Sequence, residues 1–201
     1  MSSKHPSSSA DGSRGSFDRE SQLAELTDPE TTKLAISLLR APSALMLLSE
    51  PEASSVVRYM RQLDFAEGDV LMREGDTTGA DYVLLILDGE VTVESLVVSR
   101  TTPSTLNVLG PGSLIGELGL IDGGPRSANC TASGDVRCVL LTRAALTRLI
   151  DDQPRIGAKL LLAVSLYMAK RLRDGAHKLK LYARLAQVMQ EEINKLMGTG
   201  D

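Results

Sequence analysis

The sequence has 201 residues, of which 42% are hydrophobic and 24% charged, and this suits one compact domain with flanking helices. Its formal net charge of -4 argues against a global attraction to nucleic acid or to an anionic membrane. No apolar run approaches the roughly 18 residues of a membrane span, and no signal peptide begins the chain, so we expect a soluble, cytoplasmic protein. We expect the two cysteines, Cys130 and Cys138, to be buried thiols, because two cysteines make no disulfide framework.

The first 63 residues divide into two predicted segments. Residues 1–20 are rich in Ser, Gly and charged side chains, which predicts a disordered tail. Residues 21–63 predict short helices, because Thr27 or Asp28 can cap a helix that has Pro29 in its first turn. Pro51 is expected to open a second helix.

The pattern then changes to strands, and residues 64–152 predict a β-barrel followed by a short helix capped by Thr142. Turn residues rich in Gly, Asp and Pro separate short β-rich runs. Asp88-Gly89 lies between the runs Tyr82–Leu87 and Val91–Val98 and predicts a tight hairpin. The expected fold is therefore α+β, a barrel or jelly-roll sandwich of about eight strands with short helices before it and a long helix after it.

Residues 153–198 predict that long helix, which begins at Pro154 and contains Gly157 and Gly175. Apolar residues recur at spacings of three and four, with Gln190 as the polar exception, as in the seam of a two-stranded coiled coil. The alternative is a helix that packs on its own barrel. We expect both, with the first part covering the barrel and the second part forming a homodimer. The residues of this seam are Leu172, Ala176, Leu179, Ala183, Ala186, Ile193 and Met197.

The most informative segment is 114–128, Leu-Ile-Gly-Glu-Leu-Gly-Leu-Ile-Asp-Gly-Gly-Pro-Arg-Ser-Ala. It resembles the phosphate-binding cassette of the cyclic nucleotide-binding domain family, which includes the regulatory subunits of cyclic-nucleotide-dependent protein kinases and the bacterial catabolite activator protein. The Gly-Glu-Leu, Pro-Arg and final Ala stand at the spacing of the kinase type. The resemblance covers about residues 62–180 and implies a cyclic nucleotide, cAMP or cGMP, as the ligand, with no other cofactor and no metal.

The cassette residues have a chemistry that suits a cyclic phosphodiester. A helix that starts near Glu117 presents free backbone N–H groups to an anion, and Gly116 permits a close approach of the backbone. Arg126 supplies a charged fork for phosphate oxygens, and Pro125 stiffens the turn that carries it. By the resemblance, Glu117 takes the ribose 2′-hydroxyl and Arg126 the phosphate. The expected ligand-binding residues are Gly116, Glu117, Leu118, Pro125, Arg126, Ser127 and Ala128.

The residues leave the choice of base open. The family's bacterial activator contacts adenine through hydroxyl side chains on its long helix, and the matching positions here are Gly175 and Ala176, which have none. Ser127 stands where some cGMP-binding members carry a hydroxyl. We therefore favour cAMP over cGMP only slightly, with a cyclic dinucleotide as a third option.

The expected function is a regulatory sensor that passes ligand binding to an unidentified effector protein through its helical flanks. The alternatives are a dimeric scaffold of the same fold that binds no ligand, and a relative of transcription regulators without their DNA-binding module. Only four residues follow Met197, so we expect no such module and no DNA binding. We read the basic face of the long helix as solvated (Arg171, Arg173, Lys178, Lys180 and Arg184). An enzyme is not expected, because His5 and His177 lie far apart and no catalytic set is present.

Overall fold

The computed structural model of the chain describes residues 23–42, 44, 45, 47–95 and 104–198. The predicted tail, residues 1–20, lies outside them, as does the end of the predicted strand at 96–98. In chain order the elements are β1 (Ala24–Glu25), α2 (Pro29–Leu39), α3 (Glu50–Val57), β2 (Arg61–Phe65), β3 (Val70–Met72), β4 (Tyr82–Asp88), β5 (Val91–Ser95), β6 (Ser104–Leu109), β7 (Leu114–Ile115), α4 (Glu117–Asp122), β8 (Asn129–Ala132), β9 (Val136–Thr142), α5 (Arg143–Asp152) and α6 (Pro154–Gly198).

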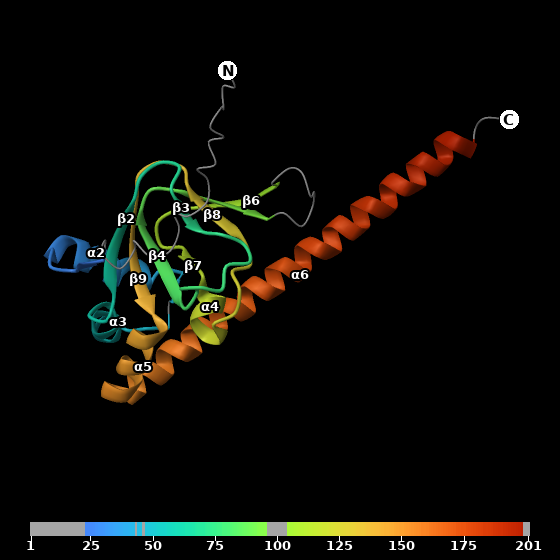
Figure 1. The fold of residues 1–201 in the computed structure, drawn as a ribbon. Helices are drawn as coiled ribbons and strands as arrows, with labels where there is room; N and C mark the ends of the chain where they lie inside the picture. Colours follow the sequence, from blue (N-terminus) through green and yellow to red (C-terminus); the bar gives the residue numbers. More distant parts are fainter. Residues whose placement is uncertain (1–22, 43, 46, 96–103, 199–201) are drawn as a thin grey trace, which may run out of the picture.

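The strands form two antiparallel sheets (Figure 1). The first has the order β1-β2-β9-β4-β7 and the second the order β3-β8-β5-β6. Strand β1 and the start of β2 fall in the segment predicted to be helical, because residues 24–25 pair with residues 61–62 at the edge of the first sheet. The predicted fold class, a jelly-roll sandwich with helical flanks and a long final helix, is confirmed.

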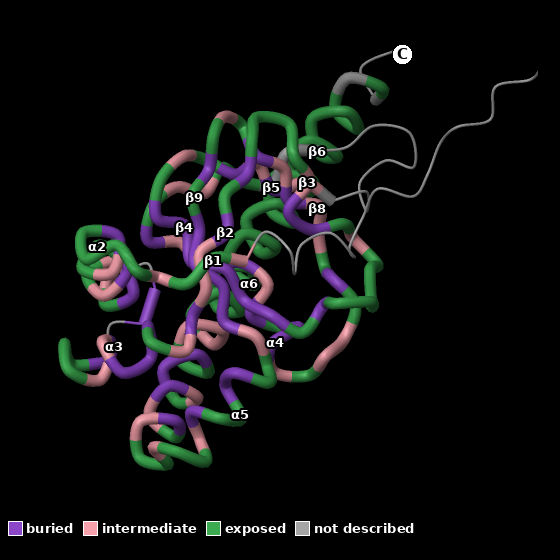
Figure 2. The backbone as a smooth tube through the Cα atoms, turned by 60° about the vertical axis from the view of Figure 1, so that its left-hand side comes forward, coloured by how far each residue is buried: buried purple, intermediate pink, exposed green. Residues whose placement is uncertain are grey.

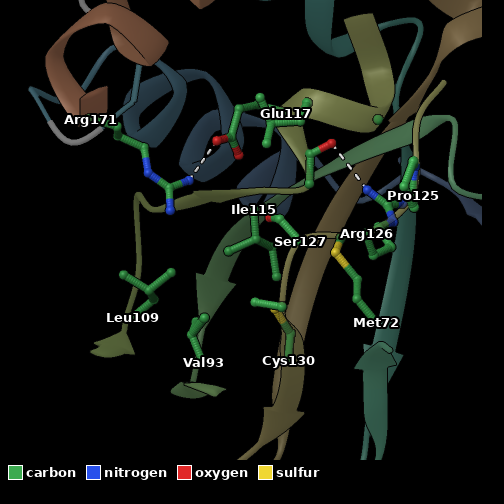
Figure 3. A pocket seen from close by; sticks show the side chains of 14 residues that line it. Met72, Val93, Leu109, Ile115, Glu117, Pro125, Arg126, Ser127, Cys130 and Arg171 are labelled. Carbon is green, nitrogen blue, oxygen red and sulfur yellow. Dashed lines mark hydrogen bonds and ion pairs between the residues drawn. The ribbon is translucent and has the colours of Figure 1, made fainter. Parts of the chain in front are cut away.

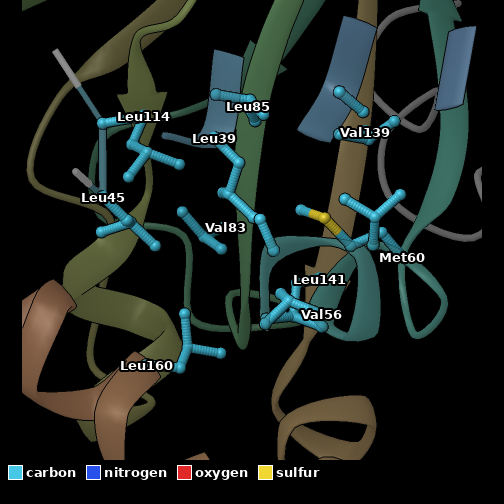
Figure 4. Close-up of a cluster of buried hydrophobic side chains, with 14 of the residues drawn as sticks. Leu39, Leu45, Val56, Met60, Val83, Leu85, Leu114, Val139, Leu141 and Leu160 are labelled. Atoms are coloured by element: carbon cyan, nitrogen blue, oxygen red, sulfur yellow. The ribbon is translucent and has the colours of Figure 1, made fainter. Parts of the chain in front are cut away.

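Strand β4 is apolar on both of its faces, which explains its uninterrupted run Tyr-Val-Leu-Leu-Ile-Leu. Its Leu84 and Ile86 belong to the core between the two sheets. Its Val83 and Leu85 belong to a second core, where helices cover the outer face of the first sheet (Figure 4). This second core also contains Leu160 of α6, so the long helix is anchored to the barrel.

The predicted hairpin at Asp88-Gly89 is wrong. Strand β4 pairs with β7 and β9 in the first sheet, whereas β5 pairs with β6 and β8 in the second. The two residues therefore form a corner at which the chain changes sheets. Gly89 has a φ of 83°, and a Cβ there would collide with the backbone of Asp135 and Val136, so the close approach of another strand requires glycine at this corner.

The helix ends follow the predicted signals. The carboxylate of Asp28 caps α2 by accepting hydrogen bonds from the N–H groups of Glu30 and Thr31, and Thr142 caps α5. Helix α3 begins after Ser49, which forms a capping box with Glu52.

Helix α6 is unbroken over 45 residues. Gly157 lies against α5, where a Cβ would collide with Ile150, whereas nothing in the structure explains Gly175. Leu160, Ala163 and Val164 are buried, but the helix is exposed from residue 170 onward (Figure 2). The first part of α6 thus covers the barrel as predicted. Among the described residues, no helix has the length and apolar character needed to cross a membrane.

Candidate functional site

A hollow opens in the barrel wall where β7, α4 and the segment before β8 meet the second sheet and α6 (Figure 3). It has an empty volume of about 440 Å³, including the open solvent at its mouth. Sites for small ligands typically measure roughly 300–1,000 Å³. It is lined by Met72, Val93, Leu109, Ile115, Gly116, Glu117, Leu118, Gly119, Pro125, Arg126, Ser127, Ala128, Cys130 and Arg171.

Gly116 joins strand β7 to helix α4 and lies in the left-handed region, with a φ of 82°. A Cβ at this position would collide with the side chains of Arg126 and Met72. Both the backbone conformation and the space therefore require glycine. Gly116 brings the first backbone N–H groups of α4 close to the guanidinium.

Arg126 is the central cation of the site, and only 6% of its surface is exposed. Its Nη1 donates hydrogen bonds to the carbonyl oxygens of Tyr82 and Gly116, at 3.0 and 3.1 Å. The guanidinium also lies over the Tyr82 ring, 4.2 Å from its centroid. Its Nη2 is buried with no hydrogen-bond acceptor among the described residues. A buried donor of a charged group costs free energy unless an acceptor meets it, so the site suits an anionic ligand.

Glu117, 6% exposed, lies on the other side of the hollow. Its Oε1 accepts a hydrogen bond from Nη1 of Arg171 at 2.6 Å, while the Arg171 side chain remains half exposed. Tyr167, one turn earlier on α6, donates from its hydroxyl to the Leu114 carbonyl at 3.0 Å. These contacts attach α6 to the cassette at the hollow.

The charges around the hollow suit a monoanion. Glu117 and Arg171 neutralise each other, whereas Arg126 has no acidic partner within the part of the chain that the structure describes. The remaining wall is apolar. Burial raises the pKa of Cys130 to about 11 although nearby Arg126 opposes the shift, so this thiol is neutral. Both cysteines are free and buried, as predicted.

All seven residues predicted for the site line the hollow, with Arg126 and Glu117 in its wall and Leu118, Pro125 and Ser127 exposed at its rim. The sequence analysis missed Arg171, which it assigned to a solvated basic face. Arg171 follows Leu160, Val164 and Tyr167 at spacings of three and four, and this periodicity indicates the covered face of the helix. It also missed the apolar wall, formed by Met72, Val93, Leu109, Ile115, Gly119 and Cys130.

Metal binding has no support among the described residues, which contain no cluster of three His, Cys, Asp or Glu side chains suited to a metal ion.

A family model described as the cyclic nucleotide-binding domain matches residues 62–153. These residues belong to that family. The match begins at β2 and ends after α5, so it contains the cassette and most of the lining of the hollow. Arg171 lies beyond it.

Three similar proteins agree with this assignment. A CRP-like cAMP-activated global transcriptional regulator from Mycobacterium tuberculosis is 32% identical over 129 residues, which are 62% of this chain and 53% of that protein. A cAMP-dependent protein kinase regulatory subunit from Dictyostelium discoideum is 30% identical over 119 residues, which are 58% of this chain and 36% of that protein. The crystal structure of a cyclic nucleotide-binding domain from Methylobacillus flagellatus has a TM-score of 0.68 and 28% identity, and the match covers 81% of this chain and 90% of that one. The chain thus spans about half or less of the length of the two sequence relatives.

Proposed function

We propose that this chain is a regulatory sensor that binds cAMP or cGMP in the hollow beside Arg126. The observation that carries the proposal is the buried guanidinium of Arg126, which has a free Nη2 donor and no acidic partner among the described residues. The phosphate of a cyclic nucleotide carries one negative charge and supplies the acceptors that this group requires. The names of the relatives, which are cAMP-activated and cAMP-dependent, support the same class of ligand.

The other cassette residues take roles that follow from their positions. We propose that Glu117 accepts a hydrogen bond from the ribose 2′-hydroxyl. Ser127 and the backbone of Gly116 and Leu118 would complete the phosphate cradle, with Pro125 and Ala128 shaping its rim. The apolar wall at Val93 and Leu109 would contact the base. We keep both purines as ligands, since hydroxyl side chains are missing at positions 175 and 176.

Transmission to α6 follows from the contact between Glu117 and Arg171. The ribose hydroxyl would approach the same carboxylate that Arg171 holds in this structure. A ligand that changes this contact shifts the position of α6 only to the extent that it binds one helix position more tightly than the other. The N-terminal helices and the exposed end of α6 would present this shift to an effector protein.

Titration calorimetry with cAMP and cGMP tests the proposed function, with 5′-AMP as a non-cyclic control. Charge-assisted hydrogen bonds contribute about 1.5–3 kcal/mol each, so Arg126→Ala should weaken binding by about 100-fold or more. Arg148→Ala removes the same charge from an exposed position on α5 and should leave the affinity unchanged. Absence of binding to every cyclic nucleotide would favour the scaffold that binds no ligand.

A second candidate function is favoured by the similarity to a transcriptional regulator. A salt-dependent gel shift with duplex DNA tests it, because phosphate contacts release counterions. The division into segments 1–20, 21–63, 64–152 and 153–198, the absence of enzymatic activity and the cytoplasmic location stay predictions.

A further inference from the structure

The distal half of α6, residues 170–198, is exposed along its length yet carries a broad apolar face. Nine large apolar side chains there are exposed: Leu172, Leu179, Leu181, Tyr182, Leu185, Val188, Met189, Ile193 and Met197. An isolated helix gains little stability from propensity alone and depends on packing of its apolar face. A face of this size indicates an interaction surface.

This apolar face continues the line along which α6 meets its own barrel. At about 100° per residue, Tyr182, Leu185 and Met189 fall on the same side of the helix as Leu160 and Tyr167, which pack on the barrel. The barrel stands on one side of α6, and the distal half projects past it (Figure 1). A flat surface such as a bilayer would meet the barrel before it reached these side chains. A second helix is narrow enough to lie beside the barrel.

The charges along this line set the direction of such a helix. Lys178, Leu185 and Glu192 are seven residues apart, so they lie nearly in one row, with the two charges at equal distances from Leu185. Residues 170–184 contain six Lys or Arg and one Asp, a net charge of +5. Residues 185–198 contain one Lys and two Glu, a net charge of -1.

A parallel pair of such helices would place the +5 segments side by side and would bring Lys178 against Lys178. An antiparallel pair places each +5 segment beside a -1 segment and each Lys178 beside a Glu192. We propose that two copies of the chain associate through the distal halves of α6 in antiparallel orientation, centred on Leu185. In this arrangement Met197 of one copy lies opposite Arg173 of the other, two residues from the hollow at Arg171.

The proposed pairing specifies the homodimer expected from the sequence, but with a different seam. The predicted seam, which includes Ala176 and Ala183, is rotated around the helix from the row of Tyr182, Leu185 and Met189. The large side chains occupy this row, and burying them removes more apolar area from water. The pairing does not depend on nucleotide binding, which calorimetry measures separately.

A charge-exchange series tests the pairing, with the dissociation constant of the dimer measured by sedimentation at low ionic strength. Lys178→Glu or Glu192→Lys alone should weaken the antiparallel dimer by about tenfold, since each places like charges together. The double variant should return to within about threefold of the original. Lys180→Glu, on the outer face, changes the same charge and should have the smaller effect. Equal constants for all variants would overturn the antiparallel direction.

Spin labels on Asn194→Cys measure the direction independently. The two labels should be offset by about 27 Å along the antiparallel axis, whereas a parallel pair gives no axial offset. Gln187→Cys, close to the centre, should give a short distance in either arrangement. The buried native thiols are not expected to react in the folded protein. A monomer with unchanged helix content at the highest concentration, a short distance at 194, or binding to anionic vesicles without self-association would each contradict the proposal.

Discussion

The two halves of α6 form one continuous helix in two different environments. Up to Met168 the helix is partly buried, and its contacts with the barrel and α3 fix its position. From residue 170 the same apolar line continues without cover. The contact between Arg171 and Glu117 stands at the boundary, beside the hollow. One amphipathic pattern can therefore serve the fold in its first half and, by our proposal, association in its second.

The largest contrast is expected between two leucines of these halves. Leu160 is 1% exposed in the helical core, so Leu160→Ala should lower the free energy of unfolding by about 2–5 kcal/mol. Leu181→Ala, at an exposed distal position, should change it by no more than about 0.5 kcal/mol in dilute solution. Urea denaturation measures both values. Similar losses for the two variants would show that the distal half is also packed.

The next effect concerns the boundary itself. Glu117→Gln keeps the shape of the side chain but removes the charge, so the affinity for cAMP should fall by about 10–100-fold. The affinity for 2′-deoxy-cAMP, which lacks the hydroxyl that Glu117 is proposed to hold, should change much less. Calorimetry gives both constants, with Glu90→Gln as a control at an exposed position. Equal losses for the two nucleotides would contradict the assigned role of Glu117.

A smaller effect is expected when the cation at the boundary is removed. Arg171→Ala leaves the buried Glu117 carboxylate without its partner and should cost about 1 kcal/mol of stability. The loss stays below that of a fully buried pair, since the Arg171 side chain is half exposed. Arg173→Ala, where the side chain is exposed, should cost almost nothing. Equal thermal stability of the two variants would contradict a structural contact at 171.

The smallest expected effect is a pH dependence from the covered half. Lys159 and the backbone N–H of Ser49 lower the pKa of Glu52 from 4.5 to about 2. Because folding lowers this pKa, the contribution is complete above about pH 4.5 and is lost as the pH falls towards 2. Glu52→Gln should therefore flatten the decline of stability in this window. Glu192→Gln, which removes an exposed pair with Lys195, should not change the profile.

The sequence allowed prediction of the cassette because its requirements are local. Gly116 is needed for a left-handed turn, and the polar residues of the site lie within 12 positions of one another. Arg171 was missed because its role depends on where α6 crosses the barrel, 54 residues from Glu117. The corner at Asp88-Gly89 was misread for a related reason. Its local residues favour a hairpin, but pairing of β4 with the distant β9 assigns β4 and β5 to different sheets.

The structure of the chain with cAMP is the most direct test of the central claim. The account predicts the cyclic phosphate within hydrogen-bond distance of the Arg126 guanidinium and the ribose 2′-hydroxyl on the Glu117 carboxylate. It also predicts a changed contact between Glu117 and Arg171. A nucleotide bound elsewhere on the molecule, with the hollow and its two charged side chains unaltered, would contradict it.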